Sequence, residues 1–184
     1  MTVLDVGGNP AIWSLLNAAA TPKVIYLNMP RAAEAEDDRS HLVFADGRRL
    51  PFPDQSFDLV FSNSVIEHVG NEASQQAFAS EIARVGKCYW VQTPNFWFPV
   101  EQHLMTPLLH WLPRAWQRVV APRATIWALL TRCNQQERQF YIQHFLEDIR
   151  LLDKAGVEKL FPDATIQRER VLGFTKSLIA LKLQ

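Results

Sequence analysis

The sequence has little cysteine or glycine and no excess of either charge. Its 184 residues include 2 cysteines, 7 glycines, and 19 basic side chains against 19 acidic ones. Cys88 and Cys133 lack Cys-x-x-Cys spacing, so we expect free thiols in a reducing compartment rather than a disulfide or a zinc framework. A protein that binds nucleic acid without selectivity normally carries a basic excess, so the balanced charge argues against a nucleic-acid partner.

The sequence also has no long apolar run and no leader-like start. No segment reaches the ~18 consecutive apolar residues that indicate a transmembrane helix. The N-terminus lacks the basic start and the cleavage site of a signal peptide. Hydrophobic residues make up 48% of the chain, which is enough to form a core. We therefore expect a single cytoplasmic domain over residues 1–184.

Short apolar segments alternate with helical patterns over the first half of the chain. A helical pattern follows the first apolar segment, and another covers residues 65–85 with a break near Gly70 and Asn71. Apolar strands joined by crossovers are typical of a parallel sheet that is covered on both faces, which predicts a doubly wound α/β fold. The predicted strands are Val3–Val6, Val24–Leu27, Leu42–Ala45, Phe57–Ser62 and Cys88–Thr93.

Residues 96–132 interrupt this alternation. They contain four tryptophans (97, 111, 116, 127), four arginines (114, 118, 123, 132) and four prolines that predict short helices. This segment is interpreted as a helical lid that binds the acceptor, and ordinary packing on the sheet is the alternative. Beyond it, we expect a helix over Phe140–Ala155 that ends at Gly156, and then a strand pair at Thr165–Arg170 and Ser177–Leu183.

Ligands of an open parallel sheet bind at the carboxyl ends of its strands. The turn after the first strand lacks the third glycine of the dinucleotide fingerprint, and Pro10 has no amide to donate to a phosphate. This disfavours NAD and suits a nucleoside cofactor without phosphate, such as S-adenosylmethionine. The candidate cofactor-binding residues at this edge are Asp5, Gly7, Gly8, Asn9, Asn28, Asp46, Gly47, Ser62 and Asn63.

Three segments carry a resemblance to a known family: Val3–Gly8, Asp46–Val60 and Ser62–Val69. Together they resemble class I S-adenosylmethionine-dependent methyltransferases, and within them the type 11 branch that methylates small molecules. The resemblance implies a Rossmann-like sheet of seven strands, mostly parallel with an antiparallel last strand. It also implies that Gly7 approaches the methionine part of the cofactor. Asn28 would face the ribose, Asp46 would bind the adenine amine, and Asn63 would lie beside the cofactor.

The chain departs from the family pattern in three ways. Asn9 and Ala11 replace glycines, and Asn28 replaces an acidic residue that binds the ribose. The chain also begins at the first strand, whereas family members usually have a helix before it, which predicts a shortened chain or a cofactor pocket open on one side. These departures leave a second hypothesis open, namely a degenerate, non-catalytic protein of the same fold that binds the cofactor or acts as a scaffold.

The predicted activity is methyl transfer to a small or lipid- or sugar-linked acceptor, with an oxygen acceptor preferred. A hydroxyl acceptor needs a general base, and the candidates are His103, Glu101 and His68, although each also suits a structural role. The histidines lack the spacing typical of a metal site, so no metal is predicted. Residues 96–132 could alternatively contact a lipid head-group region as a peripheral membrane surface.

Overall fold

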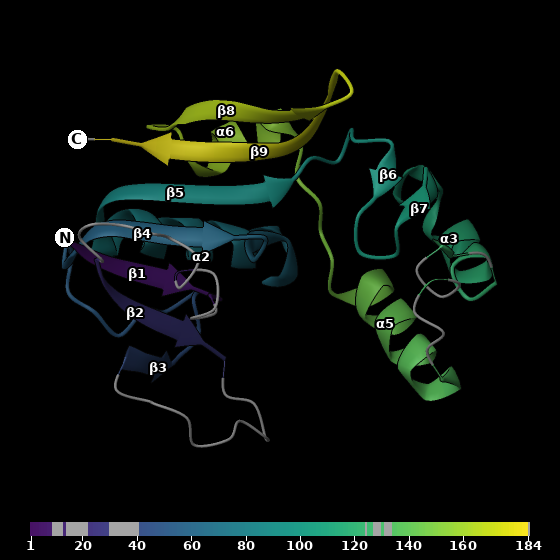
Figure 1. The fold of residues 1–184 in the computed structure, drawn as a ribbon, viewed down its shortest axis with the longest axis horizontal. Helices are drawn as coiled ribbons and strands as arrows, with labels where there is room; N and C mark the ends of the chain where they lie inside the picture. The colour runs from purple at the N-terminus through teal and green to yellow at the C-terminus, as the bar shows by residue number, and fades with distance from the viewer. Residues whose placement is uncertain are drawn as a thin grey trace.

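A seven-stranded sheet lies at the centre of the computed structural model (Figure 1). The structure describes residues 1–8, 13, 22–29, 41–123, 125, 126, 130 and 134–183. The strands run in the order β3-β2-β1-β4-β5-β9-β8, and of these only β9 is antiparallel to its neighbours. The predicted fold class is therefore confirmed. The strands are β1 (Thr2–Val6), β2 (Lys23–Asn28), β3 (Leu42–Phe44), β4 (Phe57–Asn63), β5 (Gly86–Pro94), β8 (Thr165–Val171) and β9 (Phe174–Lys182).

The segment after β4 confirms the predicted helix with a break near Gly70. A short 3-10 helix, η2 (Ile66–His68), precedes α2 (Glu72–Val85). Gly70 has a φ of +110°, and the Asn71 side chain caps α2 by accepting a hydrogen bond from the Ser74 amide. Helix α2 and α6 (Lys154–Leu160) pack on the sheet and complete the main hydrophobic core.

A second part of the chain, here called the lid, lies beyond the carboxyl edge of the sheet. The arrowheads of β1, β2, β4 and β5 point toward it in Figure 1. It consists of the described residues in 96–149 and has a core of its own, made of Leu104, Leu109, Ala121, Ile142, Phe145 and Ile149. Its elements are β6 (Val100–Glu101), β7 (Thr106–Pro107), η3 (Leu109–Trp111), α3 (Arg114–Val120) and α5 (Gln135–Glu147).

Two sequence predictions about this region are wrong. Short helices alone were expected at the prolines, but β6 and β7 form a two-stranded ribbon, which the Leu108 amide extends by donating to the Pro99 carbonyl at 2.8 Å. Gly156 was expected to end a helix, but it lies inside α6, and its amide donates to the N-cap Asp153 at 2.8 Å. Sequence periodicity cannot reveal either tertiary arrangement.

The backbone between α5 and α6 forms hydrogen bonds with η2, with α2 and with the segment after β5 instead of continuing a helix. The Arg150 amide donates to the Glu67 carbonyl at 2.8 Å, and the Leu152 carbonyl accepts from the Phe96 amide at 2.9 Å. The Gln75 side chain also donates to the Arg150 carbonyl at 2.9 Å. These bonds join the lid to the carboxyl edge of the sheet at η2 and β5.

Some sequence predictions lie outside the described residues. They concern Asn9, Ala11, the helix after β1, Trp127, Arg132 and Cys133. Within the described part of the chain, no helix is both long and apolar enough to cross a membrane.

Candidate active site

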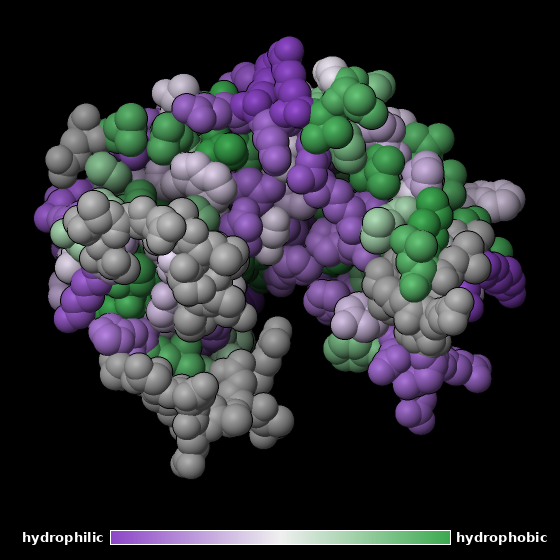
Figure 2. Space-filling view, viewed as in Figure 1, coloured by the Kyte–Doolittle hydropathy of each residue, from purple (hydrophilic) through white to green (hydrophobic). Residues whose placement is uncertain are grey.

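A cavity of about 630 Å³ opens at the carboxyl edge of the sheet. The space-filling view in Figure 2 shows a hollow between the sheet and the lid, with hydrophilic residues gathered at its inner end. Its walls come from the ends of β1 and β2, the loop after β3, and the segment that follows β4. Among its lining residues are Gly7, Asn28, Asp46, Gly47, Val65 and His68.

The turn after β1 fits against its neighbours because it has no side chains. Gly7 has a φ of +78°, and a Cβ atom there would lie 2.5 Å from a methyl group of Val65. A Cβ at Gly8 would lie 1.8 Å from the Asp5 carboxylate. The Asn28 side-chain amide donates to the Gly8 carbonyl at 3.0 Å and ties the turn to β2. The backbone is thereby held open to the cavity.

The Asp5 side chain packs against the glycine turn. Its carboxylate is buried and accepts a hydrogen bond from the Trp13 indole at 2.6 Å, while the Oδ1 atom has no hydrogen-bond partner within the described residues. Burial raises the pKa of Asp5 to about 6. The Asp5 carboxylate packs directly against Gly8 and does not line the cavity, so Asp5 shapes the turn.

Asp46 and Gly47 form the wall after β3. The Arg48 guanidinium binds the Asp46 carboxylate at 2.7 Å, and this hydrogen bond holds the pKa of Asp46 below its usual value. Gly47 packs against Phe78, whose ring would lie 2.7 Å from a Cβ at this position. The Asp46 carboxylate, a charged hydrogen-bond acceptor, is thus held in place on the cavity wall beside the closely packed backbone of Gly47.

Ser64 is the first residue after β4 that lines the cavity. The predicted residue Ser62 is fully buried, and its hydroxyl donates to the Val6 carbonyl at 3.2 Å, which joins β4 to β1. Asn63, the last residue of β4, is exposed. Ser64 adopts a φ of +55°, and its hydroxyl donates to the Gln92 side chain at 2.8 Å. Sequence reasoning missed Ser64, because its place on the cavity wall depends on this left-handed backbone conformation.

The three predicted base candidates meet where the lid touches this cavity. Glu101 is fully buried and accepts from the His103 amide at 2.9 Å and from the Leu104 amide at 2.5 Å. Its Oε1 atom lies 2.6 Å from His103 Nδ1, and His103 Nε2 lies 3.3 Å from His68 Nε2. Residues 35 positions apart in sequence thus form one polar group.

Two residues that sequence reasoning missed belong to the same group. Glu67 is fully buried, and burial raises its pKa to about 7. Its Oε2 atom accepts from the Thr93 hydroxyl at 3.0 Å. The His144 ring of α5 stacks on His68 with ring centres 5.3 Å apart. Burial lowers the pKa of His68 to about 4, so its imidazole is neutral at neutral pH. The only sequence signal for Glu67 was its position beside His68.

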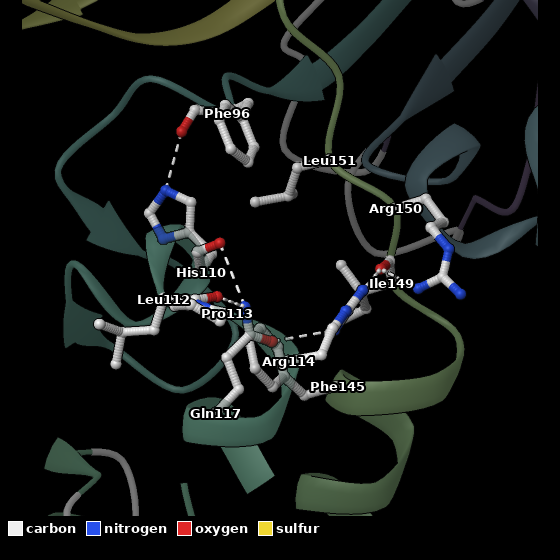
Figure 3. A pocket seen from close by; sticks show the side chains of 10 residues that line it. All are labelled: Phe96, His110, Leu112, Pro113, Arg114, Gln117, Phe145, Ile149, Arg150 and Leu151. Atoms are coloured by element: carbon white, nitrogen blue, oxygen red, sulfur yellow. Dashed lines mark hydrogen bonds between the residues drawn. The ribbon is translucent and has the colours of Figure 1, made fainter. Parts of the chain in front are cut away.

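A second cavity of about 410 Å³ lies within the lid (Figure 3). Phe96, Phe145 and Leu151 supply apolar walls, and Arg114 supplies a cation. The Arg114 guanidinium donates to the Ile149 carbonyl at 3.4 Å, and the pKa of Arg114 is lowered by burial and by nearby arginines. This cavity suits a molecule with an apolar body and a polar or anionic end.

The sequence was compared with known protein families. Residues 4–88 match the family profile described as a methyltransferase domain. The first half of the chain thus matches a methyltransferase domain. S-adenosylmethionine is its methyl donor, as the sequence predicted. The matched residues include β1 to β4, which build most of the cavity. A comparison with curated proteins finds no significant match.

Solved structures share the fold of this methyltransferase at low sequence identity. A Pyrococcus horikoshii protein is 18% identical over 98% of this chain and 80% of its own, with a TM-score of 0.54. An Aquifex aeolicus S-adenosylmethionine-dependent methyltransferase is 15% identical over 98% and 81%, with a TM-score of 0.50. A Methanosarcina mazei S-adenosylmethionine-dependent methyltransferase is 11% identical over 98% and 90%, with a TM-score of 0.56. At these identities the likeness supports the fold.

The cavity fits the donor that the family implies. The Gly7 backbone, the Asn28 amide and the Asp46 carboxylate line one continuous space. The Gly7 backbone allows a ligand to approach closely. The Asn28 side chain can bind hydroxyl groups, and the Asp46 carboxylate can accept a hydrogen bond from an amine. A nucleoside with a sulfonium and no phosphate needs this set of groups.

Proposed function

We propose that this methyltransferase methylates a hydroxyl oxygen of a small or lipid- or sugar-linked acceptor. The observation that carries the proposal is the Glu101–His103 pair, whose His103 ring meets His68 on the wall of the cofactor cavity. A hydroxyl group keeps its proton at neutral pH, so its methylation requires a group that removes the proton. An unprotonated amine would need no such pair.

His103 is the proposed base, and Glu101 orients it. With the Nδ1 proton held by Glu101, the lone pair of the His103 ring is on Nε2, the atom that faces His68. When bound, S-adenosylmethionine supplies a methyl group on a positively charged sulfur that needs no further activation. His103 Nε2 takes the hydroxyl proton as the oxygen bonds to the methyl carbon and the carbon–sulfur bond breaks.

The roles proposed for the cofactor residues follow the cavity. Gly7 lets the backbone approach the methionine part of the donor, Asn28 faces the ribose hydroxyls, and Asp46 accepts from the adenine amine. Asp5, Gly8 and Gly47 hold this wall in shape. The lid excludes water and aligns the acceptor with the methyl group.

The lid supports an amphiphilic acceptor. Several of its large apolar side chains are exposed, including Trp116 at 63% and Phe140 at 68%. Its inner cavity combines apolar walls with Arg114. A lipid tail or aromatic body would cover such surface, and the same side chains would let the lid rest on a membrane from the cytoplasmic side.

A panel of acceptors tests the proposal. Purified protein is incubated with labelled S-adenosylmethionine and with phenols, quinols and lipid-linked sugars, each beside an amine of matched shape. We expect labelled methyl ethers from at least one hydroxyl acceptor. His103→Asn should lower kcat by about 100- to 10,000-fold while the affinity for the cofactor stays unchanged. Label found on the amines alone, or full activity of His103→Asn, would refute the proposal.

A further inference from the structure

Three side chains beside the cofactor cavity have the chemistry of metal ligands. Glu67, His68 and His103 each offer one ligand atom, and these atoms all lie within 4.8 Å of one another. The Nε2 atoms of the two histidines are 3.3 Å apart. Two nitrogens bound to one tetrahedral zinc ion at 2.0–2.1 Å are separated by roughly 3.4 Å. The imidazoles are therefore already spaced for a shared cation.

The carboxylate of Glu67 supplies an independent observation. Its side chain is fully buried, and its Oε1 atom has no hydrogen-bond partner within the described residues. That atom lies 4.0 Å from His68 Nε2, while Oε2 is occupied by the Thr93 hydroxyl. A buried carboxylate oxygen without a donor is costly, and a cation between it and the imidazoles would remove this cost.

The surroundings also orient the ligands. Metal-bound histidines usually donate their second ring nitrogen to a carboxylate or a carbonyl group. Glu101 occupies that position for His103 at 2.6 Å. His144 stacks flat on His68, and the Asp148 carboxylate accepts from the His144 ring at 2.7 Å. Both imidazole planes are thus held while their Nε2 atoms converge.

We propose that Glu67 Oε1, His68 Nε2 and His103 Nε2 bind a divalent transition cation of the zinc type. His68 lines the cofactor cavity, so a fourth coordination position would open toward the acceptor. This inference rests on the proposed function and deepens it. In the loaded protein the cation would bind the acceptor hydroxyl and lower its pKa, and the proton would leave to solvent through the cavity that His68 lines. The inference keeps the proposed hydroxyl methylation and changes the role of His103 from base to metal ligand.

Metal titration of the full-length protein tests the site directly. Chelator-treated protein is titrated with Zn²⁺ by calorimetry, and with Co²⁺ while its visible ligand-field bands are recorded. We expect one cation per chain and bands typical of four-coordinate cobalt. Glu67→Gln, His68→Asn and His103→Asn should each weaken binding by about 100-fold or more. Glu101→Gln leaves the three ligands in place but alters the carboxylate that binds the His103 ring, so it should weaken binding by about 10- to 100-fold.

The control is His41→Asn, which removes a histidine that precedes β3 and is not one of the three ligands, and it should bind Zn²⁺ like the wild type. Circular dichroism of Glu67→Gln verifies that the variant is folded. Binding that is absent from the wild type, or that survives all three ligand substitutions, overturns the inference.

Activity separates this inference from the proposed function. Methyl transfer to hydroxyls that persists in chelator-treated protein without zinc binding overturns the metal site and leaves the proposed function in place. Stoichiometric zinc binding that depends on the three ligands supports the site even if no hydroxyl acceptor is methylated. That second result would overturn the proposed function alone.

Discussion

Asp5 and Glu67 are buried carboxylates at the carboxyl edge of the sheet, and each keeps one oxygen without a hydrogen-bond partner within the described residues. Such groups reduce stability when ionised, so a fold that retains them normally uses them at a functional site. Asp5 holds the glycine turn, whereas Glu67 faces the imidazoles of the lid junction. Their different surroundings lead to separate tests.

The pH dependence of stability should report on Asp5. Its folded pKa of about 6 lies above the usual aspartate value of 3.8, so the folded state binds its proton more tightly than the unfolded chain does. Stability should therefore fall as pH rises from about 4 to about 6, by on the order of 3 kcal/mol, and level off above this range. Urea unfolding at several pH values measures the free energy of unfolding. Asp5→Asn should lose less of it between pH 4 and pH 6 than the wild type does. Identical pH profiles would contradict the assignment.

Asp46→Ala tests the adenine contact. The substitution removes a charged acceptor from the cavity wall, and a hydrogen bond to a charged group is worth about 1.5–3 kcal/mol. Calorimetry should show S-adenosylmethionine binding weakened by about 10- to 100-fold. Arg48→Met is the control, because it removes the partner of Asp46 and keeps the carboxylate. If Asp46→Ala binds the cofactor like the wild type, the adenine lies elsewhere.

At the scale of elements, helix α5 carries the lid and depends on a local cap. The Asn134 side chain accepts from the Glu137 amide, and the Glu137 side chain accepts in return from the Asn134 amide. The helix is weakly apolar and buries only Ile142 and Phe145, so its own packing stabilises it little. The stability of α5 should therefore depend strongly on the cap at its N-terminus.

Asn134→Ala should loosen the lid and spare the sheet. Loss of an N-cap costs about 1 kcal/mol. Hydrogen exchange should speed up in residues 134–147 and stay unchanged in α2. Asn71→Ala, which removes the cap of α2, should produce the opposite pattern. Equal acceleration of both helices by either variant would show that they open as one unit.

At the scale of the whole molecule, the protein has two separate hydrophobic cores, one under the sheet and one in the lid. The larger core lies under the sheet that carries the cavity wall, and the smaller core lies in the lid, which we propose binds the acceptor. The chain crosses between them after β5 and returns before α6, and backbone bonds join it to η2 and β5. Binding of the donor and turnover of the acceptor should therefore respond separately to core mutations.

Leu109→Ala tests this separation. Leu109 is buried in the lid core, and its truncation should cost about 2–5 kcal/mol locally. Turnover should fall at least tenfold while the affinity for S-adenosylmethionine changes less than twofold. Val60→Ala, in the sheet core, should instead weaken cofactor binding and global stability together. Parallel losses of binding and turnover in Leu109→Ala would contradict two separate cores.

Local chemistry determined much of this protein from the sequence alone. The apolar runs predicted β1 to β5, the glycine turn and Asp46 predicted the cofactor edge, and the terminal strand pair predicted β8 and β9. These features depend on neighbours in sequence, since strand periodicity and turn chemistry act over a few residues. The parallel arrangement followed because continuous apolar strands with crossovers have few other solutions.

The tertiary structure decided what lies far apart in the chain. Only the fold brings His103 of the lid against His68 after β4, buries Glu67 beside them, and places Ser64 on the cavity wall. The ribbon of β6 and β7 and the position of Gly156 inside α6 also depend on long-range packing. Sequence spacing predicts contacts within an element, whereas burial and convergence across elements depend on how the whole chain packs. The meeting of Glu67, His68 and His103 therefore appeared only in three dimensions.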